Sequence, residues 1–265
     1  MKTLKRYIGI YIHFLKLNMK TMLEYKADFL IAFATSIPIQ IVQLMFIWVI
    51  FENISNLQGW TFYEMALIYG IMICSTGVAD TFFDAVYEMP KDYIRKGTFD
   101  NIVVQPVNSL FNIISRKFYT AGLSNFIIGT GIIVMSISNL DVNFGVIQWL
   151  LLVFFIICGG LIFGGLMTIA TTSTFWVVES IDIIWDIYTM HEFALYPIEL
   201  YNGFIKGLIT VVLPYAFASY YPATYFLGKS NGNIVWFSPL VVITIWFIAM
   251  KLWKIGMKKY GSTGS

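Results

Sequence analysis

Residues 147–170 read IQWLLLVFFIICGGLIFGGLMTIA and contain no charged side chain. A helix of about 20 mostly apolar residues crosses the hydrocarbon core of a bilayer, about 30 Å thick, with its backbone polar groups hydrogen-bonded internally. This run is long enough to do so. Because it is apolar on every side, it does not suit the half-exposed surface helix of a soluble domain. The stretch therefore predicts a transmembrane helix.

The rest of the chain repeats this pattern. Hydrophobic residues make up 58% of the 265 positions and charged residues 12%, against about 25% charged in soluble domains. Residues 1–260 are therefore expected to form a single all-α membrane domain with six transmembrane helices, and residues 261–265 read as a cloning remnant. The other predicted spans are 29–51, 61–83, 118–139, 176–196 and 234–252.

The positions of the lysines and arginines predict how these helices are oriented. Of the 17 such residues, 15 lie in residues 1–28, in residues 85–117 and from residue 251 onward. Loops rich in lysine and arginine stay in the cytoplasm. Both termini and the 85–117 loop are therefore expected inside the cell, which requires an even number of spans.

The requirement for an even number of spans decides the path of an outer region, residues 197–230. This region includes the apolar stretch 203–227. A seventh crossing there would place the basic C-terminal tail outside the cell. The region is therefore expected to re-enter the membrane from the outer face as short helices. Pro197, Pro214 and Pro222 would break these helices, and they are candidates for an outer gate.

Residues 1–28 precede the first span. Within them, residues 4–23 place apolar side chains at helical spacing, with lysines on the other faces. This pattern predicts an amphipathic helix in the inner membrane interface. The alternative is a helix packed against cytosolic protein, and both can hold at once.

The basic cytoplasmic loop contains the signals of a short helix at residues 89–97. Pro90 suits the first turn, Arg95 and Lys96 suit the negative end of the helix dipole, and Gly97 suits a left-handed stop. Such a helix is well placed to receive force from a soluble partner, although an ordinary solvated loop helix would give the same spacing. The candidate contact residues are Lys91, Asp92, Tyr93, Ile94, Arg95 and Lys96.

Glu179, Asp182 and Asp186 form an acidic stripe, because side chains three and four residues apart share one face of a helix. Acids in or beside a membrane span are costly and usually face a cavity, a partner or water. The stripe therefore has two interpretations. Either it lines the inner part of a transport pathway and favours cationic cargo, or Glu179 and Asp182 lie at the cytosolic interface and pair with Arg116, Lys117 or a partner's base.

No catalytic, metal or cofactor site is expected on this chain. Cys74 and Cys158 lie in apolar runs without neighbouring histidines, so packing is the expected role of both. Residues 223–230, ATYFLGKS, satisfy a permissive phosphate-loop pattern, but they follow a proline-broken segment and not a buried strand. The chain is therefore not expected to be an enzyme, and its net charge of +2 gives no indication of a nucleic-acid partner.

Several short motifs, taken with this order of helices, resemble a known family. They are Glu24 to Leu30 (EYKADFL) at the start of the first span, Gly97, Phe99, Asp100, Pro106 and Asn108 after the cytosolic helix, and Tyr196-Pro197, Pro214 to Phe217 and Tyr221 to Ala223 in the outer region. The chain is similar to the type-2 ATP-binding-cassette (ABC) exporter permeases, and among them to a bacterial branch of six-span permeases of about this length. Gln105 departs from that branch, which often has arginine there.

The resemblance implies a function and a set of partners. It implies a dimer with a second permease, identical or homologous, on two cytosolic ABC ATPase subunits that bind the ATP and Mg²⁺. Residues 91–96 would then couple the permease to the ATPase. The substrate would be an amphiphilic drug, peptide or lipid-like molecule, cationic under the first interpretation of the stripe, which leaves a bacterial cell across its plasma membrane.

Other classes of function stay open on the residues alone. Carboxylates in a span also suit a proton-coupled carrier or an integral-membrane enzyme, although an enzyme would be expected to gather acids from several spans. A non-transporting membrane scaffold is a third alternative.

Overall fold

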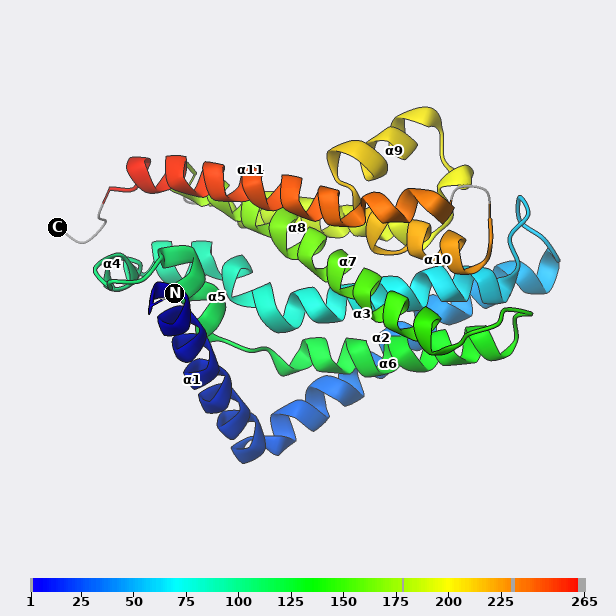
Figure 1. The fold of residues 1–265 in the computed structure, drawn as a ribbon, viewed down its shortest axis with the longest axis horizontal. Coiled ribbons are helices and arrows are strands. Elements are labelled where there is room, and N and C mark those ends of the chain that lie inside the picture. The colour runs from blue at the N-terminus through cyan, green and yellow to red at the C-terminus, as the bar shows by residue number, and fades with distance from the viewer. Residues whose placement is uncertain (1, 178, 230–231, 262–265) are drawn as a thin grey trace.

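The computed structural model describes residues 2–177, 179–229 and 232–261. Within these ranges the regular elements are helices, apart from one isolated bridge between Leu57 and Trp60. The all-α membrane fold expected from the sequence is confirmed. The long helices run lengthwise through the bundle in Figure 1, and they are α2 (Lys26–Asn53), α3 (Phe62–Tyr87), α6 (Thr120–Ser138), α7 (Val146–Thr172) and α11 (Ser238–Lys259).

Four of the predicted spans fall on helices that are long and apolar enough to cross a membrane. These helices cover Lys26–Asn53, Phe62–Ile94, Val146–Phe175 and Gly232–Lys259. The span predicted at 118–139 is the shorter helix α6, which begins at Thr120 because Lys117 and Tyr119 have extended backbone. The total of six crossings stays a prediction.

The stretch predicted as the fifth span, 176–196, is not one continuous α-helix. It contains α8 (Ile181–Thr189) followed by a tighter 3₁₀ helix (Met190–Leu195). A proline drives the residue before it out of the helical region, and Tyr196, before Pro197, is extended with φ −122° and ψ 157°. In Figure 1, α8 still leads away from the end of the bundle at which α1 begins and α11 ends.

The helix predicted at the N-terminus is confirmed as α1 (Lys2–Glu24). It crosses the end of the bundle at a steep angle to the long helices and meets α2 in a corner at Tyr25 (Figure 1). One face packs on α5 (Ser109–Arg116), where the ring centroids of Tyr7 and Phe111 lie 4.8 Å apart. The location of α1 in the membrane interface stays a prediction.

The central helix α3 packs against α6 through glycines. A Cβ on Gly77 would lie 2.8 Å from the carbonyl oxygen of Gly122, and a Cβ on Gly129 would lie 2.9 Å from that of Gly70. Real Cβ atoms essentially never approach a neighbour so closely. The two backbones are therefore in contact because these positions have no side chain, as at many helix crossings in membranes.

The outer region is broken into short pieces, as its prolines predict. Pro197 and Pro214 directly precede helical turns, and Pro222 lies in the first turn of α10. All three prolines are buried. The pieces are Ile198–Leu200, α9 (Gly203–Gly207), Leu208–Val212, Tyr215–Ala218, α10 (Tyr220–Phe226) and Gly232–Phe237.

Part of this region is packed inside the bundle. The Ser75 hydroxyl, in the middle of α3, donates to the carbonyl of Ala218 at 2.9 Å. The Ser219 hydroxyl donates to the carbonyl of Ala194 at 2.6 Å, and the Tyr215 hydroxyl donates to that of Ile187 at 2.8 Å. Irregular backbone is tolerated at membrane depth only with such protein partners.

Lys229 joins the outer region to the start of α3. Its ammonium lies 3.0 Å from a carboxylate oxygen of Glu64, donates to the carbonyl of Gly59 at 2.9 Å, and sits 4.2 Å from the ring centroid of Trp60. The other oxygen of Glu64 accepts from the backbone N–H of Thr61 at 2.9 Å, which caps α3. One lysine thus stabilises both the cap and the segment after α10.

Lys229→Met is expected to lower the free energy of unfolding by about 1–3 kcal/mol, because a partly buried carboxylate loses its charged hydrogen bond. The measurement is the melting temperature of the purified protein in detergent. Lys206→Met removes the same charge from an exposed site on α9 and serves as the control. Equal melting temperatures for the two variants would contradict the role of Lys229.

Candidate functional site

The predicted cytosolic helix is the segment Met89–Ile94, which we call the coupling segment. It is a wide π-helical turn that follows α3 after Glu88, with the N–H of Arg95 donating to the carbonyl of Pro90 at 3.0 Å. Gly97 has φ +66° and ends it, as expected. The prediction did not foresee that the segment continues α3 without an intervening loop.

The six candidate contact residues divide between a buried face and an exposed face. Ile94 is buried, Asp92 and Tyr93 are half-buried, and three bases are exposed: Lys91, Arg95 and Lys96. Exposed bases on a well-anchored helix can contact an acidic surface of a partner.

A second apolar core anchors the coupling segment. Met89 and Ile94 pack in it with Phe99, Phe175 and Trp253, which come from the following loop, the end of α7 and α11. Two short helices of the loop, α4 (Asp100–Val103) and α5, complete this core. The segment is therefore attached to three transmembrane helices.

Sequence reasoning missed α5. A signal was present, because Asn108 is an N-cap residue whose side chain accepts from the backbone N–H of Phe111 at 3.1 Å. Leu110 and Ile113 follow at helical spacing and are both buried.

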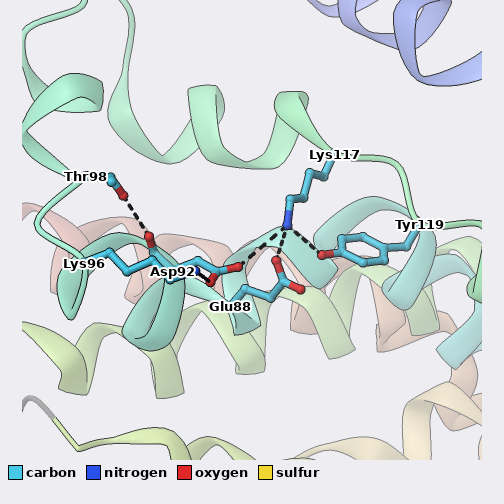
Figure 2. A network of polar contacts seen from close by, with 6 residues as sticks. All are labelled: Glu88, Asp92, Lys96, Thr98, Lys117 and Tyr119. Atoms are coloured by element: carbon cyan, nitrogen blue, oxygen red, sulfur yellow. Dashed lines mark hydrogen bonds and ion pairs between the residues drawn. The ribbon is translucent and has the colours of Figure 1, made fainter. Parts of the chain in front are cut away.

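Figure 2 shows Lys117 at the centre of an ionic network on this loop. Its ammonium pairs with Glu88, lies 3.9 Å from Asp92 and donates to the hydroxyl of Tyr119 at 3.0 Å. Asp92 also pairs with Lys96 at 2.6 Å. Burial alone would lower the pKa of Lys117, but the hydrogen bond and charge of Glu88 raise it above its usual value. Lys117 therefore stays charged and holds the coupling segment to the start of α6.

One face of α3 and the coupling segment carries four acids, Asp80, Asp84, Glu88 and Asp92, which we call the acidic face. Their spacing of four residues places them in one row. Glu88 and Asp92 both pair with Lys117. Asp84 is half-buried, and it makes no such ion pair with a described residue. This regular spacing is a signal in the sequence itself.

At its inner end the acidic face joins a chain of polar side chains within the bundle. The Asn125 amide donates to Asp80 at 3.4 Å, and the Gln40 amide donates to the Asn125 oxygen at 3.3 Å. The Tyr69 hydroxyl donates to the Gln40 oxygen. The chain links α2, α3 and α6, and hydropathy gave no indication of it.

The acidic stripe lies beside the coupling segment. All three carboxylates, on Glu179, Asp182 and Asp186, are in exposed residues. Glu179 and Asp182 line a cleft of about 250 Å³ together with Lys91 and Arg95, whereas Asp186 does not line it. The expected partners Arg116 and Lys117 do not line this cleft, and Lys117 pairs with Glu88 and Asp92 instead.

A second cleft, of about 300 Å³, lies between the acidic face and α8. We call it the aromatic cleft, and its lining residues are Asp84, Tyr87, Glu88, Lys91, Asp92, Ile181, Ile184, Trp185 and Tyr188. It combines carboxylates with three large aromatic side chains.

The phosphate-loop pattern, which was not expected to be a nucleotide site, lies in a different structural context. Lys229 of the permissive phosphate-loop pattern is bound to Glu64 and Gly59, the residues before it form α10, and Ser230 lies outside the described residues. Among the described residues there is no group of three His, Cys, Asp or Glu side chains that could hold a metal.

Comparisons with known proteins support this architecture. A family model described as "ABC-2 family transporter protein" matches residues 37–264, which include α3, the coupling segment and the outer region. Searches of curated proteins and of solved structures gave no match. The chain therefore belongs to the ABC-2 transporter family and is a membrane permease component of an ABC transporter.

Proposed function

We propose that this chain is the permease of an ATP-driven exporter in a bacterial plasma membrane. Two permeases, identical or homologous, would form a dimer on two cytosolic ABC ATPase subunits, which bind the ATP and Mg²⁺. The observation that carries the proposal is the coupling segment, which Ile94 anchors in a core. Lys91 within the segment, and Arg95 and Lys96 directly after it, are exposed.

The distribution of charge supports the proposed orientation. The coupling segment, α5 and the end of α11 lie at one end of the bundle in Figure 1, together with the start of α1. These segments carry most of the lysines and arginines, and such segments stay in the cytoplasm. Both termini are therefore proposed to be cytoplasmic.

The packing of the outer region supports export. Residues 215–226 reach Ser75 in the middle of α3, as a segment that re-enters from the outer face would. The buried Pro197, Pro214 and Pro222 stiffen this segment and are proposed as parts of an outer gate. An amphiphilic drug, peptide or lipid-like substrate would leave past it.

The surroundings of the acidic stripe favour an ionic role for two of its members. Glu179 and Asp182 share a cleft with Lys91 and Arg95, so their charges are offset by these bases. Asp186 lies outside that cleft and stays the member proposed for a cationic pathway. We therefore do not propose that all three carboxylates together select a cationic cargo.

The coupling role is tested by co-purification. Replacing residues 91–96 with Gly/Ser, or replacing Lys91, Arg95 and Lys96 with alanine, is expected to reduce recovery of the ATPase at least about tenfold, because the contact surface is lost. The control removes the same charge at the exposed end of α11, by replacing Lys251, Lys254 and Lys258 with alanine. Full recovery of the ATPase with the altered coupling segment would contradict the proposal.

A second candidate function is a proton-coupled carrier. The polar chain from Tyr69 through Gln40 and Asn125 to Asp80 favours it, because hydrogen-bonded side chains in a span can relay protons. The two functions give opposite results in sealed vesicles. A carrier transports on a proton gradient without ATP, whereas the exporter requires ATP and its ATPase.

A further inference from the structure

The aromatic cleft contains a carboxylate, Asp84, for which the described residues provide no ion pair. Glu88 and Asp92 share Lys117, and Asp92 also has Lys96. Asp84, between them and the span, has no hydrogen bond or ion pair with a described residue. A half-buried carboxylate without a partner is costly, so a cation entering the cleft would be attracted to Asp84.

Aromatic rings from α3 and α8 line the cleft together with Asp84. The rings of Tyr87 and Tyr188 lie with centroids 6.2 Å apart at 70°, and those of Trp185 and Tyr188 lie 5.4 Å apart at 72°. Faces of aromatic rings attract cations, and a ring cluster beside a carboxylate is a common way to bind a bulky organic ammonium group. A small hydrated ion would make less use of these rings.

A second observation also indicates an absent ligand. The hydroxyl of Tyr87 is buried and has no hydrogen-bond partner among the described residues. Buried polar groups are nearly always paired, so such a group suggests a partner that is not part of the chain. Tyr87 lines the same cleft as Asp84.

One base, Lys91, also lines the aromatic cleft. Its side chain is exposed, and it lines the smaller cleft as well, where Glu179 and Asp182 offset its charge. Ile181 and Ile184 complete the wall from α8 with apolar surface. The inner part of the aromatic cleft therefore combines a negative charge with apolar and aromatic walls.

We propose that the aromatic cleft is the binding site for the cationic group of an amphiphilic organic cation, held by Asp84 and by the rings of Tyr87, Trp185 and Tyr188. The volume of about 300 Å³ suits a headgroup with its apolar substituents. Trp185, on α8, is 57% exposed, so a cation could reach its ring from outside the bundle. That this cation is then exported rests on the proposed function.

The test compares two probes of equal shape and opposite charge. The full-length permease, without ATPase, is placed in phosphatidylcholine nanodiscs, and binding of tetraphenylphosphonium is measured by a scintillation proximity assay. Unlabelled tetraphenylborate is the competitor of opposite charge. The wild-type protein is expected to bind the cation saturably, and the borate is expected not to compete.

Four variants locate the site. Asp84→Asn is expected to weaken cation binding at least about tenfold, and Trp185→Ala about three- to tenfold. Trp185→Phe is expected to retain most of the affinity, because a ring stays in place. Asp141→Asn changes an exposed acid in the loop before α7 and is expected to bind as the wild type does.

Wild-type affinity in both Asp84→Asn and Trp185→Ala, or equal competition by tetraphenylborate, would overturn the site. If Asp84→Asn does not fold, as judged by gel filtration, the two variants of the exposed Trp185 test the site by themselves. The result is independent of the exporter proposal. Full recovery of the ATPase with the altered coupling segment would overturn that proposal and leave the binding result standing. Failure of the cation to bind would leave the ATPase result standing.

Discussion

Gly122→Ala is expected to produce the largest loss of stability of any single methyl group added to the bundle. A Cβ at this position would lie 2.5 Å from the carbonyl oxygen of Gly77 and 2.5 Å from the amide nitrogen of Thr81. Both atoms belong to the backbone of α3, so they cannot rotate away as a side chain would. The helices must separate, which costs about 3 kcal/mol, at the upper end of measured overpacking effects.

Thermal unfolding of the purified protein in detergent measures this loss. A loss of about 3 kcal/mol corresponds to about 6–12 °C in the melting temperature of a chain of this size. Gly131→Ala is the matched control, because Gly131 lies on the same helix and a Cβ there would have no neighbour within 4 Å. A melting temperature of Gly122→Ala equal to that of the control would show that α3 and α6 do not pack in this way.

Lys117→Met is expected to separate ATP hydrolysis from transport. Without this ammonium, Glu88 and Asp92 lose the base that they share, and their like charges repel. The coupling segment would then lose its ionic attachment to the start of α6, although its apolar core would still hold it. We therefore expect the ATPase to co-purify, while substrate-stimulated ATP hydrolysis falls about tenfold, equivalent to ~1.4 kcal/mol in the coupled step.

Stimulated ATPase activity of the reconstituted complex is the measurement. Lys254→Met is the control, because it removes the same charge from an exposed side chain near the end of α11, outside the coupling segment and its ionic network. This variant is expected to stay coupled. Equal stimulation in both variants would mean that Lys117 is not required for coupling.

Helix periodicity and hydropathy were sufficient for the long, uninterrupted apolar helices. They predicted the stretches that became α2, α7 and α11, because uninterrupted apolar runs have few other stable structures in a bilayer. They were not sufficient for residues 176–196. Hydropathy averages over the window and cannot register that Pro197 and an extended Tyr196 end the helical path after a short α8.

The sequence predicted where the candidate site lies along the chain, but not which side chains contact one another there. The proline, bases and glycine of the coupling segment are local signals, and local signals predict where a helix begins and ends. The partner of Lys117 is a tertiary property. Its sequence distance from Glu88 is 29 residues, and only the folded loop brings the two together. The aromatic cleft likewise lies between α8 and the continuous path of α3 and the coupling segment. These segments are far apart in the sequence, so no local signal indicates that they meet.

The continuity of α3 with the coupling segment has a mechanical consequence. The path Phe62–Ile94 has 33 residues, and at about 1.5 Å per residue it is about 50 Å long. A rotation of about 10° around one end would displace the other end by about 9 Å. The far end is next to Glu64 and its ion pair with Lys229. If the coupling segment receives a push at Lys91, as proposed, this rigid path would carry the movement to the end that bears Glu64 and amplify it by its length, without a relay of side chains.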